Sequence, residues 1–378
     1  MLSRSIASVV PFGSANAIIG GGTFCDDRFR PRSAESGLGD VMSEVARRRL
    51  TASGYAALVV GVLVAGLALA LTLMSIVDAP RILAGDYLTY QAGSSHLLAG
   101  QKLYPSWELH GPFLLGDGAW GQGYVYPPTA ALLTVPFAML GTSMGFLAFA
   151  EFALIGLWAV VYRIGRQEGL GSRWAAVLAT AFCLSGPSID AVMTGQANAY
   201  VAVAVGLAWI APSMTGYLGF AFALVKLFPG ALLVMALRDR APILKPALLA
   251  GLLVIATTAA VGVNAWAEFA KVFQNGLGRP LAFPVAPRQY LESTFGSVPA
   301  TVLVDVATGV ILVASYLVRS RHLAIFLVSL AMILPAPQWY WHYLLILLMG
   351  LVPGAARWLS ALPSAGGRPW ARPGRVPT

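Results

Sequence analysis

The chain has 378 residues, of which 57% are apolar and only 11% are charged, and its mean hydropathy is +0.72. Water-soluble domains carry about twice this charged fraction, so the composition argues against a soluble protein and predicts one membrane-embedded domain. The net charge of +9 is divided among short loops between apolar stretches. This distribution is typical of the cytoplasmic loops of membrane proteins and argues against nucleic acid as a partner.

The two ends of the chain differ in composition from the rest. Residues 1–50 mix Gly, Ser, Arg and Asp without a sustained apolar period, and residues 361–378 are rich in Pro, Gly and Arg. Segments of this kind cannot bury enough apolar surface to fold. We therefore expect a disordered cytoplasmic tail at each end, with a membrane-embedded domain over residues 51–360 between them.

Nine apolar segments follow one another within this domain, and we predict helical membrane segments near residues 55–77, 128–162, 174–190, 197–211, 216–237, 246–264, 297–318, 323–336 and 342–357. Segment 128–162 is too long for one crossing and contains the helix breakers Pro136 and Gly141, while segment 216–237 is interrupted by Lys226. Both are expected to contain broken or partly inserted helices. The predicted fold is all-α and polytopic, with about nine to eleven transmembrane or partly inserted helices.

The basic loops set the expected orientation in the membrane. Basic residues cluster in short loops, as Arg163, Arg166 and Arg173, as Arg238, Arg240 and Lys245, and as Arg319 and Arg321. The positive-inside rule assigns such loops to the cytoplasmic face. The outer face of the cell membrane then carries two large loops, residues 78–127 and 265–296, and two turns, residues 186–198 and 335–342. These outer segments hold most of the unusual polar and aromatic residues, so we expect the site there.

The first outer loop carries an acidic residue among aromatic ones. Asp86 and Tyr90 are four residues apart, and Tyr104 and Tyr126 follow before the next apolar segment. Residues four apart share one face of a helix. A carboxylate in this setting can act as general base for a sugar hydroxyl, or it can be a solvated aspartate beside an aromatic belt.

Two polar motifs interrupt the apolar segments that follow. Gln196 and Asn198 stand at the start of one segment, where amides can bind hydroxyls or phosphate or cap a helix. Lys226 lies inside another, three residues before Pro229. A lysine in an apolar segment marks an ion, proton or phosphate contact, or a partner carboxylate, but it can also extend its ammonium to the interface. Glu151 and Asp305 are the acids in apolar segments that could pair with it.

The last outer turn is aromatic. Residues 335–343 contain two prolines, a run of Trp and Tyr, and one histidine, including Trp339 and His342. Aromatic faces can bind sugar rings, and His342 can hydrogen-bond or neutralise a phosphate. An aromatic belt with an incidental histidine is the alternative.

Taken in this order, the motifs resemble those of glycosyltransferase family 87. These are multispanning enzymes of the GT-C superfamily, which includes mannosyltransferases dependent on polyprenol-phosphate-mannose. The resemblance extends from Tyr55 to Leu359 and rests on Asp86 with Tyr90, Gly100…Leu103-Tyr104, Tyr126-Pro127-Pro128, Gly195-Gln196-x-Asn198, Lys226-x-x-Pro229 and Trp339-x-x-His342.

The resemblance implies a GT-C-type fold and a hexosyltransferase that uses a polyprenyl-phosphate-linked sugar, with mannose as the expected hexose. It implies inverting transfer to an envelope glycolipid or polysaccharide, with Asp86 as general base and His342 as a contact to the donor phosphate or sugar. Tyr90, Tyr104, Tyr126, Gln196, Asn198, Lys226 and Trp339 are the further substrate-binding candidates. We expect no metal and no cofactor besides the donor, since the sequence contains no acidic cluster.

Three other functions fit a multispanning protein of this composition. A transporter or flippase of lipid-linked substrates would use Lys226, Glu151 and Asp305 as a charge relay in the membrane. Many transporters contain internal repeats, and the two halves of this chain show no convincing similarity. A non-catalytic scaffold would not need Asp86, and an O-antigen polymerase or ligase would transfer whole oligosaccharides rather than one sugar.

Overall fold

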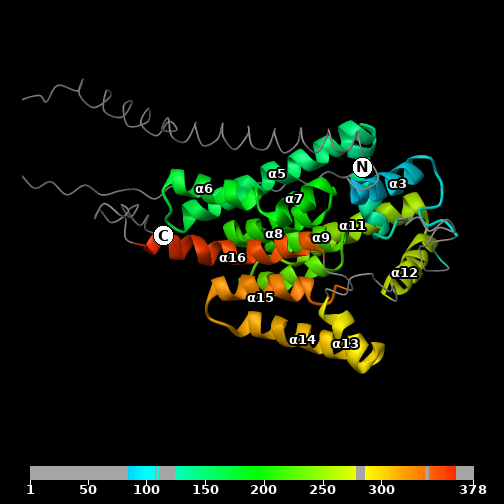
Figure 1. Cartoon of the computed structure of the whole chain (residues 1–378). Helices are drawn as coiled ribbons and strands as arrows, with labels where there is room; N and C mark the ends of the chain where they lie inside the picture. The colour runs from blue at the N-terminus through cyan, green and yellow to red at the C-terminus, as the bar shows by residue number, and fades with distance from the viewer. Residues whose placement is uncertain (1–83, 107–108, 110–123, 278–285, 337–339, 363–378) are drawn as a thin grey trace, which may run out of the picture. The chain divides into compact units, whose positions relative to one another are not determined.

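The computed structural model describes residues 84–106, 109, 124–277, 286–336 and 340–362 (Figure 1). All of them belong to the second of two compact units, residues 50–378. The predicted N-terminal tail, the predicted C-terminal tail after residue 362, the predicted span 55–77 and Trp339 lie outside the described residues. Ala361 still belongs to the last helix.

The described residues form helices and short turns, and no strand. In chain order the helices are α3 (Gly85–Leu98), α4 (Pro128–Ala138), α5 (Thr142–Gln167), α6 (Ser172–Cys183), α7 (Gly186–Met193), α8 (Asn198–Ile210), α9 (Thr215–Ala223), α10 (Leu232–Arg238), α11 (Leu244–Val261), α12 (Asn264–Leu277), α13 (Pro287–Phe295), α14 (Ser297–Leu317), α15 (Arg321–Ile333) and α16 (Trp341–Ala361). Two 3₁₀ turns accompany them, η2 (Pro212–Met214) and η3 (Phe228–Ala231). The all-α prediction is confirmed.

Within the described part of the chain, four helices are long and apolar enough to cross a membrane, namely α5, α11, α14 and α16. The pair α6 and α7, bent by 58°, makes a fifth if it is one broken span. Four further apolar helices are shorter, at 10–17 residues. A helix of that length falls short of a hydrocarbon core of about 30 Å. The chain is therefore a polytopic membrane protein with full spans and partly inserted helices together.

Both segments that were expected to be broken are broken. Segment 128–162 divides at Gly141, where φ is +79°, while Pro136 stays inside α4. Segment 216–237 divides into α9, a turn with Lys226, η3 and α10. A Cβ atom added at Gly216 would lie 2.3 Å from the Pro242 carbonyl oxygen, and at Gly219 it would lie 2.9 Å from the Leu233 side chain. Glycine at 219 thus lets α9 and α10 pack closely as a hairpin, and glycine at 216 lets the start of α9 lie against the segment that joins α10 to α11.

The two long segments predicted to connect membrane spans on the outer face contain helices. Segment 78–127 contains α3, and segment 265–296 contains most of α12 and all of α13. Their polar residues lower the hydropathy, but helix formation depends on periodicity and packing rather than on total hydropathy. On α12, for example, Val272 is buried while Phe273 is 43% exposed.

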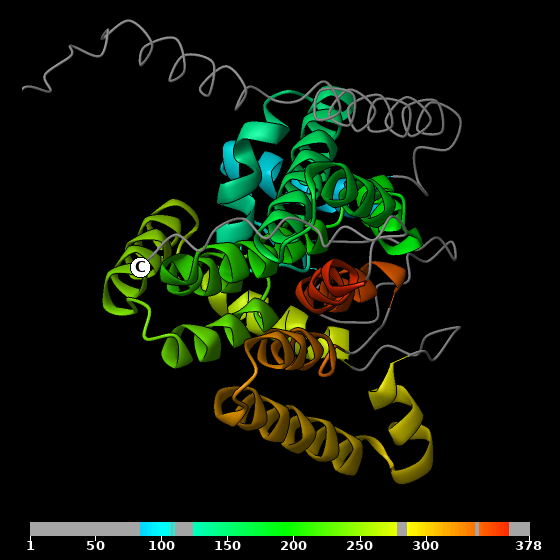
Figure 2. The same cartoon turned by 90° about the vertical axis from the view of Figure 1, so that its left-hand side faces the viewer.

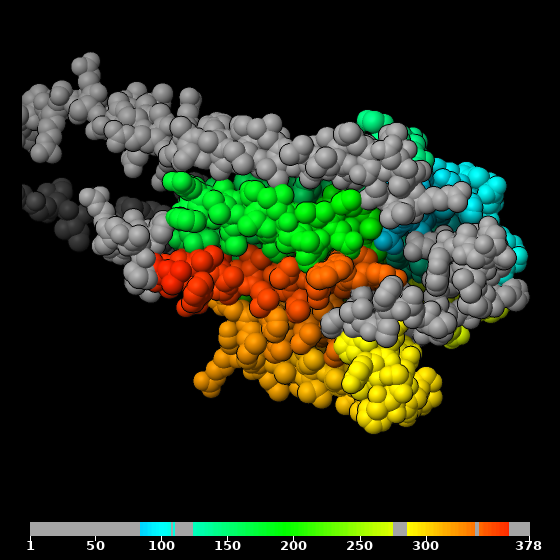
Figure 3. Space-filling model, viewed as in Figure 1, coloured from blue at the N-terminus to red at the C-terminus, as the bar shows by residue number. Residues whose placement is uncertain are grey.

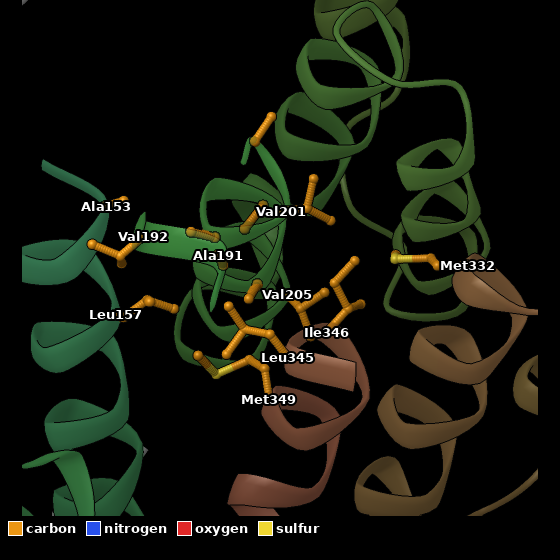
Figure 4. Packing of buried hydrophobic residues seen from close by; sticks show 14 of the residues in the cluster. Ala153, Leu157, Ala191, Val192, Val201, Val205, Met332, Leu345, Ile346 and Met349 are labelled. Atoms are coloured by element: carbon orange, nitrogen blue, oxygen red, sulfur yellow. The ribbon is translucent and has the colours of Figure 1, made fainter. Parts of the chain in front are cut away.

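The core lies between α5, α7, α8 and α16 (Figure 4). Leu157, Val192, Val201 and Leu345 from these four helices meet there. A Cβ atom at Gly206 would lie 2.1 Å from the Val160 side chain, so α5 and α8 approach closely, as small residues permit in membrane helices. This packing holds the ends of α7, α8 and α16 together.

The helices α14, α15 and α16 succeed one another as neighbours in both views (Figures 2 and 3). Large apolar side chains on α11 and α14 remain exposed, with Leu252 at 61% and Val310 at 63%. An exposed apolar surface of this extent marks contact with an apolar partner. In a polytopic protein that partner is the lipid bilayer.

Candidate functional site

Five parts of the chain converge at one end of the helical unit. They are the start of α3, the residues before α4, the junction of α7 and α8, the turn after α9 and the start of α16. Eight of the nine predicted site residues are described, and hydrogen bonds and ring contacts join all eight into one network: Asp86, Tyr90, Tyr104, Tyr126, Gln196, Asn198, Lys226 and His342.

Asp86 is held in place by the backbone at the start of α3. Ala84 adopts a left-handed conformation with φ +60°, and its N–H donates to the Met193 carbonyl at 2.8 Å. The N–H groups of Asp86 and Tyr87 donate to the Thr194 carbonyl at 3.1 and 3.2 Å. The end of α7 thus satisfies N–H groups that the first turn of α3 leaves free. The Asp86 carboxylate is half-buried and stands at the positive end of the α3 dipole.

Two stacked tyrosines lie beside this carboxylate. The ring centroids of Tyr90 and Tyr126 are 4.3 Å apart, and the Tyr126 hydroxyl donates to Asp86 Oδ1 at 3.2 Å. Burial raises the pKa of both phenols well above the usual value, and the neighbouring Asp86 charge raises them further. Both hydroxyls therefore keep their protons and act as donors. Tyr104 supports the pair, because its hydroxyl donates to the Tyr126 carbonyl at 2.6 Å.

Lys226 occupies the turn between α9 and η3 and is only 7% exposed. Its ammonium donates to Gln196 Oε1 at 2.5 Å and to Asn198 Oδ1 at 2.9 Å, and it lies 5.4 Å from the Tyr126 ring centroid. The break in the helix frees the Leu224 carbonyl, which accepts a hydrogen bond from the Thr129 hydroxyl. Such a substitute partner is what non-helical backbone at membrane depth requires.

The partners of Lys226 differ from the acids that the sequence suggested. The four ion pairs found among the described residues do not include Lys226. Glu151 is half-buried on α5, and Asp305 is exposed on α14. The buried cation is therefore coordinated by neutral amides, so its charge is not cancelled by a direct ion pair in this part of the structure.

Sequence reasoning missed Asp190, which belongs to the same network. Its Oδ2 accepts hydrogen bonds from His342 Nδ1 at 2.9 Å and from the His342 backbone N–H at 3.1 Å. His342 is 4% exposed, and its Nε2 lies 3.4 Å from Gln196 Nε2. The sequence signal for Asp190 was its position, because it is the acidic residue of turn 186–198, which was predicted to lie on the outer face.

The arrangement combines three chemical capacities at one place. A half-buried carboxylate can accept a proton, a buried ammonium can stabilise a developing negative charge, and tyrosine hydroxyls that keep their protons can donate hydrogen bonds. Asn198 adds a free donor, since its buried Nδ2 has no hydrogen-bond partner among the described residues. Groups of these kinds suit a reaction that deprotonates a hydroxyl and releases an anion.

The helical fold and this network define a polytopic membrane protein with a polar site at one end of its helices. The model of glycosyltransferase family 87 matches residues 124–363, most of the chain, and the protein belongs to this family. It is therefore a membrane-embedded glycosyltransferase. The comparisons with curated proteins and with solved structures found no match. Family membership favours the transferase over the transporter and scaffold alternatives.

The family match covers one part of the site, and the other part lies before it in the sequence. Tyr126, Gln196, Asn198, Lys226 and the segment with His342 fall inside residues 124–363. Asp86, Tyr90 and Tyr104 precede the match, and the hydrogen bonds and ring contacts above connect them to it.

Proposed function

We propose that the protein transfers a hexose, with mannose as the expected sugar, from a polyprenyl-phosphate donor to a glycolipid or polysaccharide acceptor on the outer face of the cell membrane. The observation that carries the proposal is the juxtaposition of Asp86 and Lys226 on the two sides of one tyrosine. The Tyr126 hydroxyl donates to Asp86, and the Tyr126 ring lies 5.4 Å from the Lys226 ammonium. A base and a cation that both neighbour one tyrosine suit the two ends of a displacement reaction.

The base end of the reaction is assigned to Asp86. Its carboxylate takes the proton of the acceptor hydroxyl as the hydroxyl oxygen attacks the anomeric carbon of the donor. The new glycosidic C–O bond forms on the face opposite the phosphate, so the anomeric configuration is inverted. The hydrogen bond from Tyr126 orients the carboxylate, and one proton ends on Asp86 for each sugar transferred.

The leaving-group end is assigned to Lys226 and its neighbours. The anomeric carbon–phosphate oxygen bond breaks with its electron pair, and polyprenyl phosphate leaves with the added negative charge. An ammonium has three donors, and Gln196 and Asn198 accept from two of them. The third donor, with Asn198 Nδ2, is free to bind the phosphate, and His342 lies on the same side through Gln196. Fixed donors at the developing charge lower the barrier more than donors in water do.

Sugar binding is assigned to the aromatic residues. The stacked rings of Tyr90 and Tyr126 lie next to both ends of the reaction. Trp339 remains a predicted sugar contact beyond the described residues. Aromatic faces bind the apolar faces of sugar rings without the cost of burying further charge.

The test is transfer from defined donors in membrane vesicles that contain the protein. Radiolabelled mannose, glucose and galactose are supplied in turn as polyprenyl monophosphates, and label is followed into lipid and polymer fractions. We expect one of them to be transferred as a single sugar with inverted configuration, and Asp86→Ala to abolish the transfer. Label entering as whole oligosaccharides would instead indicate a polymerase or ligase, and retained activity in Asp86→Ala would contradict the assigned base.

A further inference from the structure

We propose that Asp190 is a positioning residue for sugar transfer, acting through the tautomer of His342 to hold the Gln196 amide with its oxygen toward Lys226. The proposal rests on the proposed function, because Gln196 and Lys226 are the groups assigned to the leaving phosphate. Asp190 itself is not assigned a contact with either substrate.

The chain of hydrogen bonds begins at an obligatory donor. An ammonium has no acceptor, so the Gln196 atom 2.5 Å from Lys226 Nζ must be the amide oxygen. The Tyr90 hydroxyl, which stays protonated, donates to the same oxygen at 3.2 Å. With the oxygen on that side, the Gln196 amide nitrogen faces His342 Nε2 at 3.4 Å.

The middle of the chain fixes the histidine. An amide nitrogen only donates, so His342 Nε2 must accept and cannot carry a proton. In a neutral imidazole the proton then belongs to Nδ1. His342 Nδ1 lies 2.9 Å from Asp190 Oδ2, and an ionised carboxylate only accepts. Every link therefore runs in one direction, from the Lys226 ammonium through Gln196 and His342 to the Asp190 carboxylate.

The constraint at Asp190 is as strict as the one at Lys226. If His342 took the other tautomer, its Nε2–H would face the Gln196 nitrogen, and two donors would oppose each other. The amide would have to turn over, which would bring its NH₂ group toward the Lys226 ammonium. By holding the proton on Nδ1, Asp190 prevents this turn, so a residue remote from the reacting atoms sets which atom coordinates the cation.

A simpler role for Asp190 is a cap on α16. Its Oδ2 accepts the His342 backbone N–H at 3.1 Å, and a carboxylate at a helix N-terminus is favourable. The two roles predict different results in a protein whose position 342 has no imidazole. A cap acts on the backbone N–H, which any residue at 342 keeps, whereas the positioning role requires the ring.

The first experiment measures the tautomer directly. The full chain is labelled with ¹⁵N-histidine and reconstituted in lipid, and the His342 nitrogens are assigned by their loss in His342→Gln. We expect a protonated Nδ1 and an unprotonated Nε2 in the wild type, the same pattern in Asp190→Asn, and loss of it in Asp190→Ala. The Asn side chain keeps the pattern because its amide oxygen takes the place of Oδ2, where it accepts both hydrogen bonds. An unchanged His342 signal in Asp190→Ala would overturn the proposal.

A matched control exists at the opposite end of the helices, where His322 Nε2 lies 3.2 Å from Glu168 Oε2. Glu168→Gln should change the signals of His322 alone and leave transfer unchanged. A change at His342 in this variant would show that the signals report general disturbance, which also counts against the proposal.

The second experiment is a double-mutant cycle on the transfer rate. We expect Asp190→Ala to lower kcat/KM by about 10- to 100-fold, the range found for carboxylates that orient metal-binding histidines, and Asp190→Asn to restore most of it. In a His342→Gln background the same Asp190→Ala change should have less than about a twofold effect, because residues that act through one another are not additive. An equal loss in both backgrounds would identify Asp190 as a helix cap only.

The two experiments separate this proposal from the proposed function. The nitrogen signals do not depend on any donor sugar. If the wild type transfers none of the tested sugars, the proposed function is contradicted, but the tautomer measurement still tests the role of Asp190. If transfer is active and the His342 nitrogen signals do not change in Asp190→Ala, only the positioning role is contradicted.

Discussion

The two ends of the helical unit carry charged residues in opposite ways. At the end away from the site, Arg321 donates to the Ala208 and Trp209 carbonyls and to Asp239 at 2.9–3.2 Å, and it lies 4.5 Å from the Trp209 ring. Glu168 accepts from Trp209 Nε1 and pairs with His322. These contacts tie the ends of α5, α8 and α10 to the start of α15.

At the site end, Lys226 and Asp86 contact neutral groups instead. Lys226 is held by two amide oxygens, and Asp86 accepts from a phenol. A charge that is already paired with an opposite charge has little left to offer a ligand, whereas a charge held by neutral dipoles keeps its field. The difference indicates that one end stabilises the fold while the other is prepared for a charged substrate, and mutations at the two ends should separate stability from activity.

The largest expected effect is at the proposed base. Asp86→Asn keeps the size of the side chain and an acceptor for the Tyr126 hydroxyl but removes the carboxylate that takes the proton. We expect transfer to fall about 10³-fold, within the range for loss of a general base, with little change in thermal unfolding. The transfer rate under saturating donor measures it.

Its matched control is Asp239→Asn at the opposite end. Asp239 pairs with Arg321 at 3.2 Å, so this change should lower the unfolding temperature and leave the transfer rate of the folded protein near that of the wild type. If Asp239→Asn abolished transfer or Asp86→Asn did not, the contrast between the two ends would be wrong.

The second prediction concerns the buried cation. Lys226→Met preserves length and apolar contact while removing the charge assigned to the phosphate, and we expect transfer to fall about 10²-fold, as for loss of one donor to a developing anion. Because burying an ammonium is costly, the unfolding temperature should change far less than the activity does. Donor titrations with both proteins measure the effect, and a variant that unfolds without losing specific activity would show that Lys226 is structural.

The sequence predicted the class of fold and most of the site for identifiable reasons. The membrane helices were predicted from apolar runs that are longer than helices of soluble proteins require. The break in segment 216–237 was predicted from Lys226 and Pro229 inside such a run. The candidates from Asp86 to His342 stood out because polar residues are costly in apolar surroundings. Each of those signals is local.

The features that were missed depend on distant contacts. Nothing near Lys226 in sequence indicates Gln196 as its partner rather than Glu151 or Asp305. The two residues meet because the hairpin of α9 and α10 brings Lys226 next to Gln196. Asp190 is unremarkable until α16 presents His342 to it. The helices α3, α12 and α13 lie in segments that the sequence placed between membrane spans, and their low hydropathy does not indicate whether such a segment is helical.

The third prediction returns to the stabilising end. Arg321→Met leaves Asp239 without its cation and two carbonyl groups without their donor. We expect a loss of about 2 kcal/mol, below the value for a fully buried pair because both side chains are partly exposed. Thermal unfolding in detergent should show a lower midpoint, while transfer per folded molecule stays within about twofold of the wild type. A large loss of specific activity at an unchanged midpoint would contradict the separation of roles.

The smallest expected effect is at Tyr126. Tyr126→Phe keeps the stack on Tyr90 and removes one hydrogen bond to the Asp86 carboxylate, so transfer should fall about tenfold, in keeping with about 1.5 kcal/mol for a single bond to a charged group.

The pH dependence of that effect tests why the phenol is a donor. Burial raises the pKa of Tyr126 well above its usual value, so the folded protein keeps the phenolic proton while an exposed tyrosine would begin to lose it. The ratio of wild-type to Tyr126→Phe activity should therefore stay constant between about pH 6 and pH 10. A phenol with an ordinary pKa would ionise toward the top of this range, lose its bond to Asp86 and repel the carboxylate, so the ratio would fall to one or below. Parallel pH–rate profiles of the wild type and Tyr126→Phe would thus show that the neutral Tyr126 phenol supports catalysis through its hydrogen bond to Asp86.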